Sequence, residues 1–195
     1  MKYAVAALLL VVEVSAVHAG LKTFTDRDRF TAAVAVLSTD GFEDTVTAVD
    51  VTAAGLDRPG YKLSFTAEKP ESSAKLLPTL PKPRAVAGDR DAGLTYDGEY
   101  WDFAELTFTF DQPITAFAVD TSPVATNALL IVIETANGPD VIDPLPVGAK
   151  EGFLGPFFGV TSSEPITSIT FEQGYRKKPK FAFDDVTLGT VRRNE

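Results

Sequence analysis

Apolar and polar residues alternate with a period of two along most of this chain, which is the pattern of β-strands with one buried face. The clearest case is LTFTF at residues 106–110. Residues 129–133 are apolar throughout, as in a strand covered on both faces. The stretch from Phe157 to Gly189 predicts three consecutive strands. Further strands are predicted at residues 61–67, 94–96, 114–120, 141–145 and 153–160.

Prolines and small polar residues divide this pattern. Residues 111–113 (DQP) and 163–165 (SEP) predict turns between neighbouring strands. Residues 68–84 contain four prolines, which donate no ladder hydrogen bond, so we expect a long surface loop there. About ten short strands with regular turn signals indicate an all-β fold, an antiparallel β-sandwich of jelly-roll type.

One short helix is predicted near the N-terminus of this sandwich. Thr25 is its expected N-cap and Asp28 falls in the first turn, where an acidic side chain suits the helix dipole. Phe30, Val34 and Leu37 then lie on one face. We expect the helix to cover one edge or end of a sheet.

The first nineteen residues predict a secretory signal. Lys2 is followed by an apolar run over residues 3–12, and residues 17–19 (VHA) favour cleavage ahead of Gly20. The run is too short for a membrane span; the alternative is a buried or membrane-anchoring helix. We therefore expect a single domain over residues 20–195 in a secreted or periplasmic protein, without a membrane span after signal removal.

Composition excludes several kinds of catalytic site. The chain has one His, one Met and no Cys, and both His18 and Met1 lie in the predicted signal. The mature chain therefore has no Ser-His-Asp triad, no thiol nucleophile, no His or Cys zinc ligand and no disulfide. The formal net charge of −9 argues against nucleic acid as a partner.

Three carboxylates stand near the two ends of the predicted sandwich: Glu43 near the start, Asp184 and Asp185 near the end. In a jelly-roll the first and last strands commonly lie side by side, which would bring these acids together. Carboxylates so grouped repel each other unless an Arg, a Lys or a hard cation neutralises them. Calcium suits a site made only of oxygen ligands. The simpler alternative is that the Asp pair is solvated and Glu43 pairs with a lysine.

The same residues carry a family resemblance. Residues 41–43 (GFE) and 181–186 (FAFDDV) are similar to the "DFE" and "aiDDi" signatures of MAM-type and carbohydrate-binding-module-like jelly-roll sandwiches. The overall layout resembles secreted bacterial sandwich proteins associated with PEP-CTERM sorting tails. The resemblance implies a structural calcium ion held by Glu43, Asp184 and Asp185. The chain departs from the pattern because Asp40 stands one residue early, and because no hydrophobic sorting tail follows Gly189, which favours a released protein.

A second candidate site combines aromatic rings with acids. Tyr96, Asp97, Tyr100 and Trp101 fall within seven residues, and aromatic faces beside carboxylates suit sugar rings and their hydroxyls. The alternative is that Trp101 packs in the core, as large aromatic side chains usually do. Asp97 and Glu99 also offer the two carboxylates of a glycosidase, although neighbouring acids on a turn seldom flank a cleft.

Together these features predict a secreted, non-enzymatic binding or matrix module. Its expected partner is a polysaccharide or an extracellular matrix component, and its expected cofactor is one structural calcium ion. Two alternatives stay open: a glycan-active hydrolase that uses an Asp/Glu pair, and a purely structural extracellular protein.

Overall fold

The computed structural model describes residues 20–52, 55–68, 72–77, 93–97, 104–121, 124–125, 129–142, 153–154, 156–173 and 180–192. Within these residues the elements, in chain order, are β1 (Leu21–Phe24), α1 (Arg27–Ala33), β2 (Val34–Asp40), β3 (Val49–Asp50), β4 (Leu56–Arg58), β5 (Tyr61–Ala67), β6 (Ser73–Leu77), β7 (Gly93–Asp97), β8 (Ala104–Thr121), β9 (Val124–Ala125), β10 (Leu129–Thr135), β11 (Gly138–Ile142), β12 (Phe153–Leu154), β13 (Phe157–Gln173) and β14 (Lys180–Val191).

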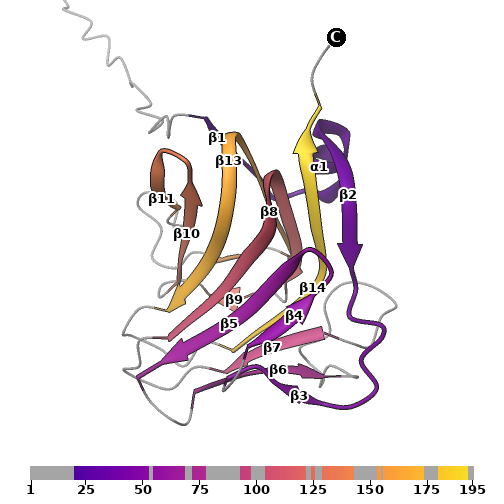
Figure 1. Cartoon of the computed structure of the whole chain (residues 1–195), viewed down its shortest axis with the longest axis vertical. Helices are drawn as coiled ribbons and strands as arrows, with labels where there is room; N and C mark the ends of the chain where they lie inside the picture. Colours follow the sequence, from indigo (N-terminus) through magenta and orange to yellow (C-terminus); the bar gives the residue numbers. More distant parts are fainter. Residues whose placement is uncertain are drawn as a thin grey trace, which may run out of the picture.

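Two layers form because the long strands β8 and β13 change partners midway (Figure 1). In the first layer, residues 104–110 of β8 lie between β5 and the second half of β13, giving the order β11-β10-β13-β8-β5-β4. In the second layer, the other half of β8 lies between the first half of β13 and β14. Strand β1 flanks β13, while β2 and β7 flank β14, and β6 and β3 continue from β7. The predicted antiparallel β-sandwich with one short helix is confirmed.

The two predicted turns at residues 111–113 and 163–165 are wrong. Both stretches lie inside a strand, the first in β8 and the second in β13. The register between these strands shifts there, from Thr161 opposite Ala116 to Ile166 opposite Ile114. A proline is tolerated at such an irregularity because the ladder is already interrupted. The chain therefore passes from one layer to the other at these points, as strands do at sandwich corners.

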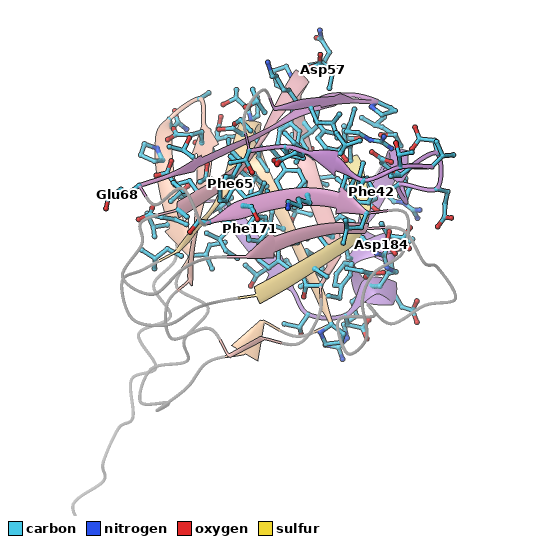
Figure 2. All side chains as sticks on the ribbon, turned by 90° about the horizontal axis from the view of Figure 1, so that it is seen from below. Phe42, Asp57, Phe65, Glu68, Phe171 and Asp184 are labelled. Atoms are coloured by element: carbon cyan, nitrogen blue, oxygen red, sulfur yellow. The ribbon has the colours of Figure 1, made fainter. Side chains whose placement is uncertain are left out.

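Alternating side chains of the two layers form the main core. Phe108 lies at its centre, with ring centroids 5.7 Å from Tyr61, 5.4 Å from Phe117 and 5.9 Å from Phe171. Two of these three ring pairs, Phe108–Phe117 and Phe108–Phe171, are edge-to-face, an arrangement that aromatic quadrupoles favour. Phe171 is labelled among the strands in Figure 2. The periodicity of residues 106–110 thus correctly predicts which face is buried.

Helix α1 is shorter than predicted and begins one residue later. Its N-cap is Asp26, whose carboxylate accepts the N–H of Arg29 at 2.8 Å. The chain turns extended at Val34 because residues 34–40 pair with β14 as β2, and this leaves Leu37 64% exposed. The helix covers the outer side of the second layer, where Phe30 packs with Phe24, Val34, Ala116, Ala118 and Phe157.

The loop predicted over residues 68–84 is wrong for residues 73–77. These form β6, which pairs with β7 and β3, and Ala74 and Leu76 are buried. Residues 73–77 contain no proline, so every residue of β6 can donate a ladder bond. Residues 78–84 lie outside the described part of the chain.

The start and end of the described chain meet as predicted. Strand β2 pairs with β14 over residues 34–40, with Asp40 opposite Val186. Within the residues that the structure describes, no helix is long and apolar enough to cross a bilayer.

Candidate functional site

The predicted aromatic site is only partly covered by the described residues. Tyr96 and Asp97 belong to β7, where their backbones pair with Phe181 and Lys180 of β14. Their side chains, and the whole of Tyr100 and Trp101, lie outside what the structure describes. The chain leaves the second layer at Asp97 and re-enters the first layer at Ala104.

One end of the sandwich carries several such crossings between the layers. Ala67 of β5, Ala104 of β8 and Gln173 of β13 are successive register partners at the end of the first layer. Ala104 begins β8 and Gln173 ends β13 in this layer, whereas Asp97 ends β7 and Lys180 begins β14 in the second layer. Glu68, which follows Ala67, lies on the opposite side of the molecule from Phe42 and Asp184 (Figure 2).

Beside this end the first layer turns polar side chains outward. Leu106, Phe108 and Phe171 face the core, so their neighbours along the strands face away from it. Glu105 and Glu172 stand directly opposite each other on β8 and β13, and Thr66 of β5 is the other partner of Glu105. We call this surface the hydroxyl–carboxylate face, defined by Ser64, Thr66, Glu105, Thr107, Thr170 and Glu172.

Electrostatics make the two glutamates an unfavourable pair. Partial burial raises the pKa of Glu172 above its ordinary value, and the nearby charge of Glu105 raises it further. Like charges at directly opposite positions of an antiparallel pair destabilise the sheet. Two register pairs along, on the same face, the Thr107 and Thr170 hydroxyls are 2.9 Å apart and hydrogen-bond across the same strands. The face therefore offers hydroxyl donors and acceptors next to two carboxylates held at fixed spacing by the sheet.

Two of the predicted calcium ligands, Asp184 and Asp185, lie in β14 next to the residues that pair with β2, and Glu43 follows the end of β2 by three residues. Glu43 is exposed on the segment after β2, whereas Asp184 is 5% exposed. Asp185 adopts a left-handed backbone with φ of 47°, and its N–H donates to the Asp184 carboxylate at 2.7 Å. Among the described residues no three His, Cys, Asp or Glu side chains are grouped to hold a metal ion. The calcium site remains a prediction for experiment.

Arg27 supplies positive charge close to Asp184. Asp184 stands opposite Asp120 on β8, on the outer side of the second layer. Arg27 of α1 approaches Asp120 to 2.7 Å and lies over the ring of Phe157, 4.9 Å from its centroid. It also lies within 3.5 Å of the Thr187 hydroxyl. An arginine was one of the neutralising groups that the sequence left open.

A second arginine binds the acids at and just after the end of β2, and sequence reasoning missed it. Arg58 of β4 donates two hydrogen bonds to Asp40, at 2.6 and 2.8 Å, and contacts Asp44 at 2.8 Å. The Tyr61 hydroxyl and the Phe42 N–H also donate to Asp40, at 2.7 and 3.1 Å. We call Asp40, Asp44, Arg58 and Tyr61 the Arg58 cluster.

Hydrogen bonding decides the ionisation of this cluster. Burial alone would raise the pKa of Asp40, but the donors of Arg58, Tyr61 and Phe42 together lower it below its ordinary value. Burial and the Asp40 charge raise the pKa of Tyr61, so its hydroxyl stays protonated and donating. The side chains of the Arg58 cluster are hydrogen-bonded to one another, so the cluster stabilises the start of the sandwich. No local motif marks it, because Asp40 and Arg58 meet only after β4 folds against β5.

Comparisons with known proteins give distant likenesses. No family model and no curated protein matches the chain. Among solved structures, a family 11 carbohydrate-binding module of a cellulosomal cellulase from Clostridium thermocellum is 15% identical, with a TM-score of 0.38, covering 83% of this chain and 98% of that one. A family 22 module of Clostridium thermocellum Xyn10B is 16% identical, with a TM-score of 0.38 and coverage of 80% and 92%. The K3 adhesin domain of Lys-gingipain from Porphyromonas gingivalis is 10% identical, with a TM-score of 0.40 and coverage of 80% and 99%.

Proposed function

We propose that this chain is a secreted, non-catalytic carbohydrate-binding module whose ligand lies on the hydroxyl–carboxylate face. The observation that carries the proposal is the pairing of Glu105 with Glu172 among Ser and Thr side chains on the outer side of the first layer. Carboxylates and hydroxyls are the acceptors and donors that sugar hydroxyls require. A bound sugar hydroxyl donating to Glu172 offsets the repulsion between the two glutamates.

The predicted aromatic residues stand close to this face in the sequence. Trp101 is four residues before Glu105, and an extended chain spans at most about 3.6 Å per residue, so their Cα atoms lie within about 14 Å of each other. Tyr96 and Asp97 end β7 in the second layer, and Tyr100 is five residues before Glu105 in the sequence. We propose that Trp101 and Tyr100 stack on sugar rings while the carboxylates accept from their hydroxyls.

The placement of the carboxylates favours binding over hydrolysis. A glycosidase needs two carboxyl groups that flank the scissile bond. Glu105 and Glu172 project from adjacent strands on the same side of one sheet, so both would contact the same side of a ligand. Such a pair is suited to hold hydroxyls rather than to deliver a proton and a nucleophile to opposite sides of one bond.

Calcium belongs to the proposal as a structural ion with Glu43, Asp184 and Asp185 as its ligands. Its support is the buried Asp184 carboxylate next to the left-handed Asp185, in a corner that also holds Asp120. Its proposed effect is on stability alone. Sugar binding on the hydroxyl–carboxylate face is therefore expected with or without calcium, as long as the protein stays folded.

A glycan array with the chain from Gly20 to Glu195, run with and without calcium, tests the function. We expect neutral glycans among the bound ligands, and Glu172→Gln or Glu105→Gln to weaken the best one about tenfold or more, since each removes a hydrogen bond to a charged group. Trp101→Ala is expected to weaken it further. Glu134→Gln is the matched control: it lies on the outer side of the same layer, opposite Ser168 and farther along the strands.

Three results would contradict the proposal. Binding that Glu172→Gln and Glu105→Gln leave unchanged would place the ligand elsewhere. Absence of any glycan ligand for the folded protein would favour the purely structural alternative. Release of sugar products from a bound glycan would instead favour the hydrolase.

A further inference from the structure

A hollow of about 930 Å³ lies at the end of the sandwich where β8 and β13 bend, far along both strands from the Glu105–Glu172 pair. Its size lies in the range of small-molecule sites. Hydroxyl side chains from three strands line it: Thr115 of β8, Thr161, Ser162 and Ser163 of β13, and Thr190 of β14. Thr161 and Ser162 are 7% and 3% exposed, so these two residues are largely buried, and the Ser162 hydroxyl accepts the N–H of Glu164 at 3.0 Å.

The charge of this hollow is opposite to that of the protein. The chain has 27 acidic residues and a formal net charge of −9, yet among the described residues that line the hollow none is acidic, and Arg192 is the charged one. The Nε–H of Arg192 donates to the Val34 carbonyl at 2.7 Å, and its backbone N–H donates to Ala33 at 3.1 Å. The guanidinium is thereby held in place, and its Nη groups are the donors that remain for a ligand.

Gly20 forms another part of the wall. Its carbonyl accepts the N–H of Ser163 at 3.0 Å and its φ is 96°. A Cβ at this position would overlap the Ser163 hydroxyl, which would have to rotate away, and the positive φ itself favours glycine. Cleavage at the predicted signal site would give this fixed residue a free α-amino group, which is a cation at neutral pH.

We propose that the hollow binds an anionic group, a carboxylate or a sulfate. Arg192 and the α-amino group of Gly20 neutralise its charge, and the Ser and Thr hydroxyls donate to its oxygens. Hydrogen bonds between cations and such oxyanions are the strong, charge-assisted kind. The site is distinct from the hydroxyl–carboxylate face, where two carboxylates would repel the same group. It rests on the predicted cleavage ahead of Gly20, because without it one of the two cations is missing.

Two probes distinguish the sources of the anion: inorganic sulfate, and a trisaccharide of uronic acids. Isothermal titration of the exported protein, whose first residue is checked by N-terminal sequencing, is expected to show one site for at least one of them. Binding of the trisaccharide identifies an acidic glycan as the source, and binding of sulfate alone identifies a free ion. Both support the site.

Three variants locate that binding. Arg192→Gln, and a chain with an Ala-Ser dipeptide ahead of Gly20, are each expected to weaken it about tenfold or more. Arg29→Gln is the matched control, since Arg29 is exposed on α1 and does not line the hollow. An exported chain that begins elsewhere, no binding of either probe, or binding that survives either of the first two changes would overturn the proposal. Neutral glycan binding, tested through Glu172→Gln, stays independent of all three.

Discussion

Replacing Arg58 by methionine tests whether the Arg58 cluster holds the start of the sandwich together. The side chains of Arg58 and Asp40 are 9% and 8% exposed, and the guanidinium lies over the Phe42 ring, 5.3 Å from its centroid. Methionine keeps much of the apolar stem in that position but removes two of the four donors that reach Asp40. Removing one partner of a buried ion pair costs about 3–5 kcal/mol, a large share of the about 5–15 kcal/mol that stabilise an ordinary domain.

Two further variants grade the effect. Tyr61→Phe removes one hydrogen bond to a carboxylate and is expected to cost about 1.5–3 kcal/mol. Asp44→Ala removes the other acid that Arg58 contacts, but this side chain is 69% exposed, so we expect a loss of at most about 1 kcal/mol. The predicted order of destabilisation is Arg58→Met, then Tyr61→Phe, then Asp44→Ala.

The pH dependence gives an independent check. Because the pKa of Asp40 is lowered in the folded state, its stabilisation is present above the ordinary value of 3.8 and is lost as the pH falls through the folded pKa. In Arg58→Met, burial dominates and the pKa of Asp40 is expected to rise. Protonation of Asp40 at low pH then stabilises the folded variant but destabilises the folded wild type. The difference between their free energies of unfolding therefore shrinks below about pH 4.

Urea denaturation at pH 7 and at pH 3.5 to 4 measures the free energy of unfolding of all four proteins. An unchanged slope with denaturant shows that the compared states are the same. Loss of stability in Arg58→Met no greater than in Asp44→Ala would refute the reasoning. A difference from the wild type that stays constant down to the lowest pH would refute the assignment of that loss to Asp40.

Three other changes have defined outcomes. Glu172→Gln is expected to stabilise the protein at pH 7 by about 0.2–1 kcal/mol, because it removes a like-charge pair. Since the pKa of Glu172 is raised in the folded state, this gain should vanish below the ordinary value of 4.5. Urea denaturation at pH 7 that shows no gain would contradict this. Millimolar calcium is expected to raise the Tm of chelator-treated protein and Asp185→Ala to abolish the rise, whereas an unchanged melting curve would exclude the ion. Gly159→Ala is expected to cost about 1–3 kcal/mol, because its Cβ would lie 2.8 Å from the Phe30 ring and 2.9 Å from the Phe157 ring; an unchanged Tm would show that α1 moves freely away.

The features that follow from local periodicity could be predicted from the sequence. Residues 61–67 match β5 because their side-chain alternation reflects which face is covered. Residues 129–134 match β10, but only Ile131 and Ile133 are buried while Leu130 and Val132 are half-buried, so the predicted covering of both faces is wrong. The meeting of β2 with β14 was predicted from the jelly-roll arrangement and is confirmed. These predictions need no knowledge of which strand lies beside which, except at the two ends.

The failures have a common physical cause. Residues 111–113 and 163–165 look like turns, yet paired partners on both sides keep each long strand continuous through its bend. Val34 continues the helical pattern of α1, yet pairing with Val191 draws it into β2. In each case pairing with strands distant in the sequence overrides a local preference, so the sequence of the segment alone does not predict its structure.

The site residues that sequence reasoning missed depend on register in the same way. Glu105 and Glu172 form a pair only because β8 and β13 are aligned so that Phe108 meets Ile169; a slip of one residue would turn one glutamate toward the core. The alternation predicts that each glutamate faces outward, but not that they face outward together. A like-charge pair on an accessible face is a cost that a purely structural sheet has no need to keep, which is why we regard it as the mark of a ligand. The stability gain and the binding loss expected from the one change Glu172→Gln therefore have to occur together. A gain without a loss of binding would separate the pair from function, and a loss of binding without a gain would show that the pair is not a cost to stability.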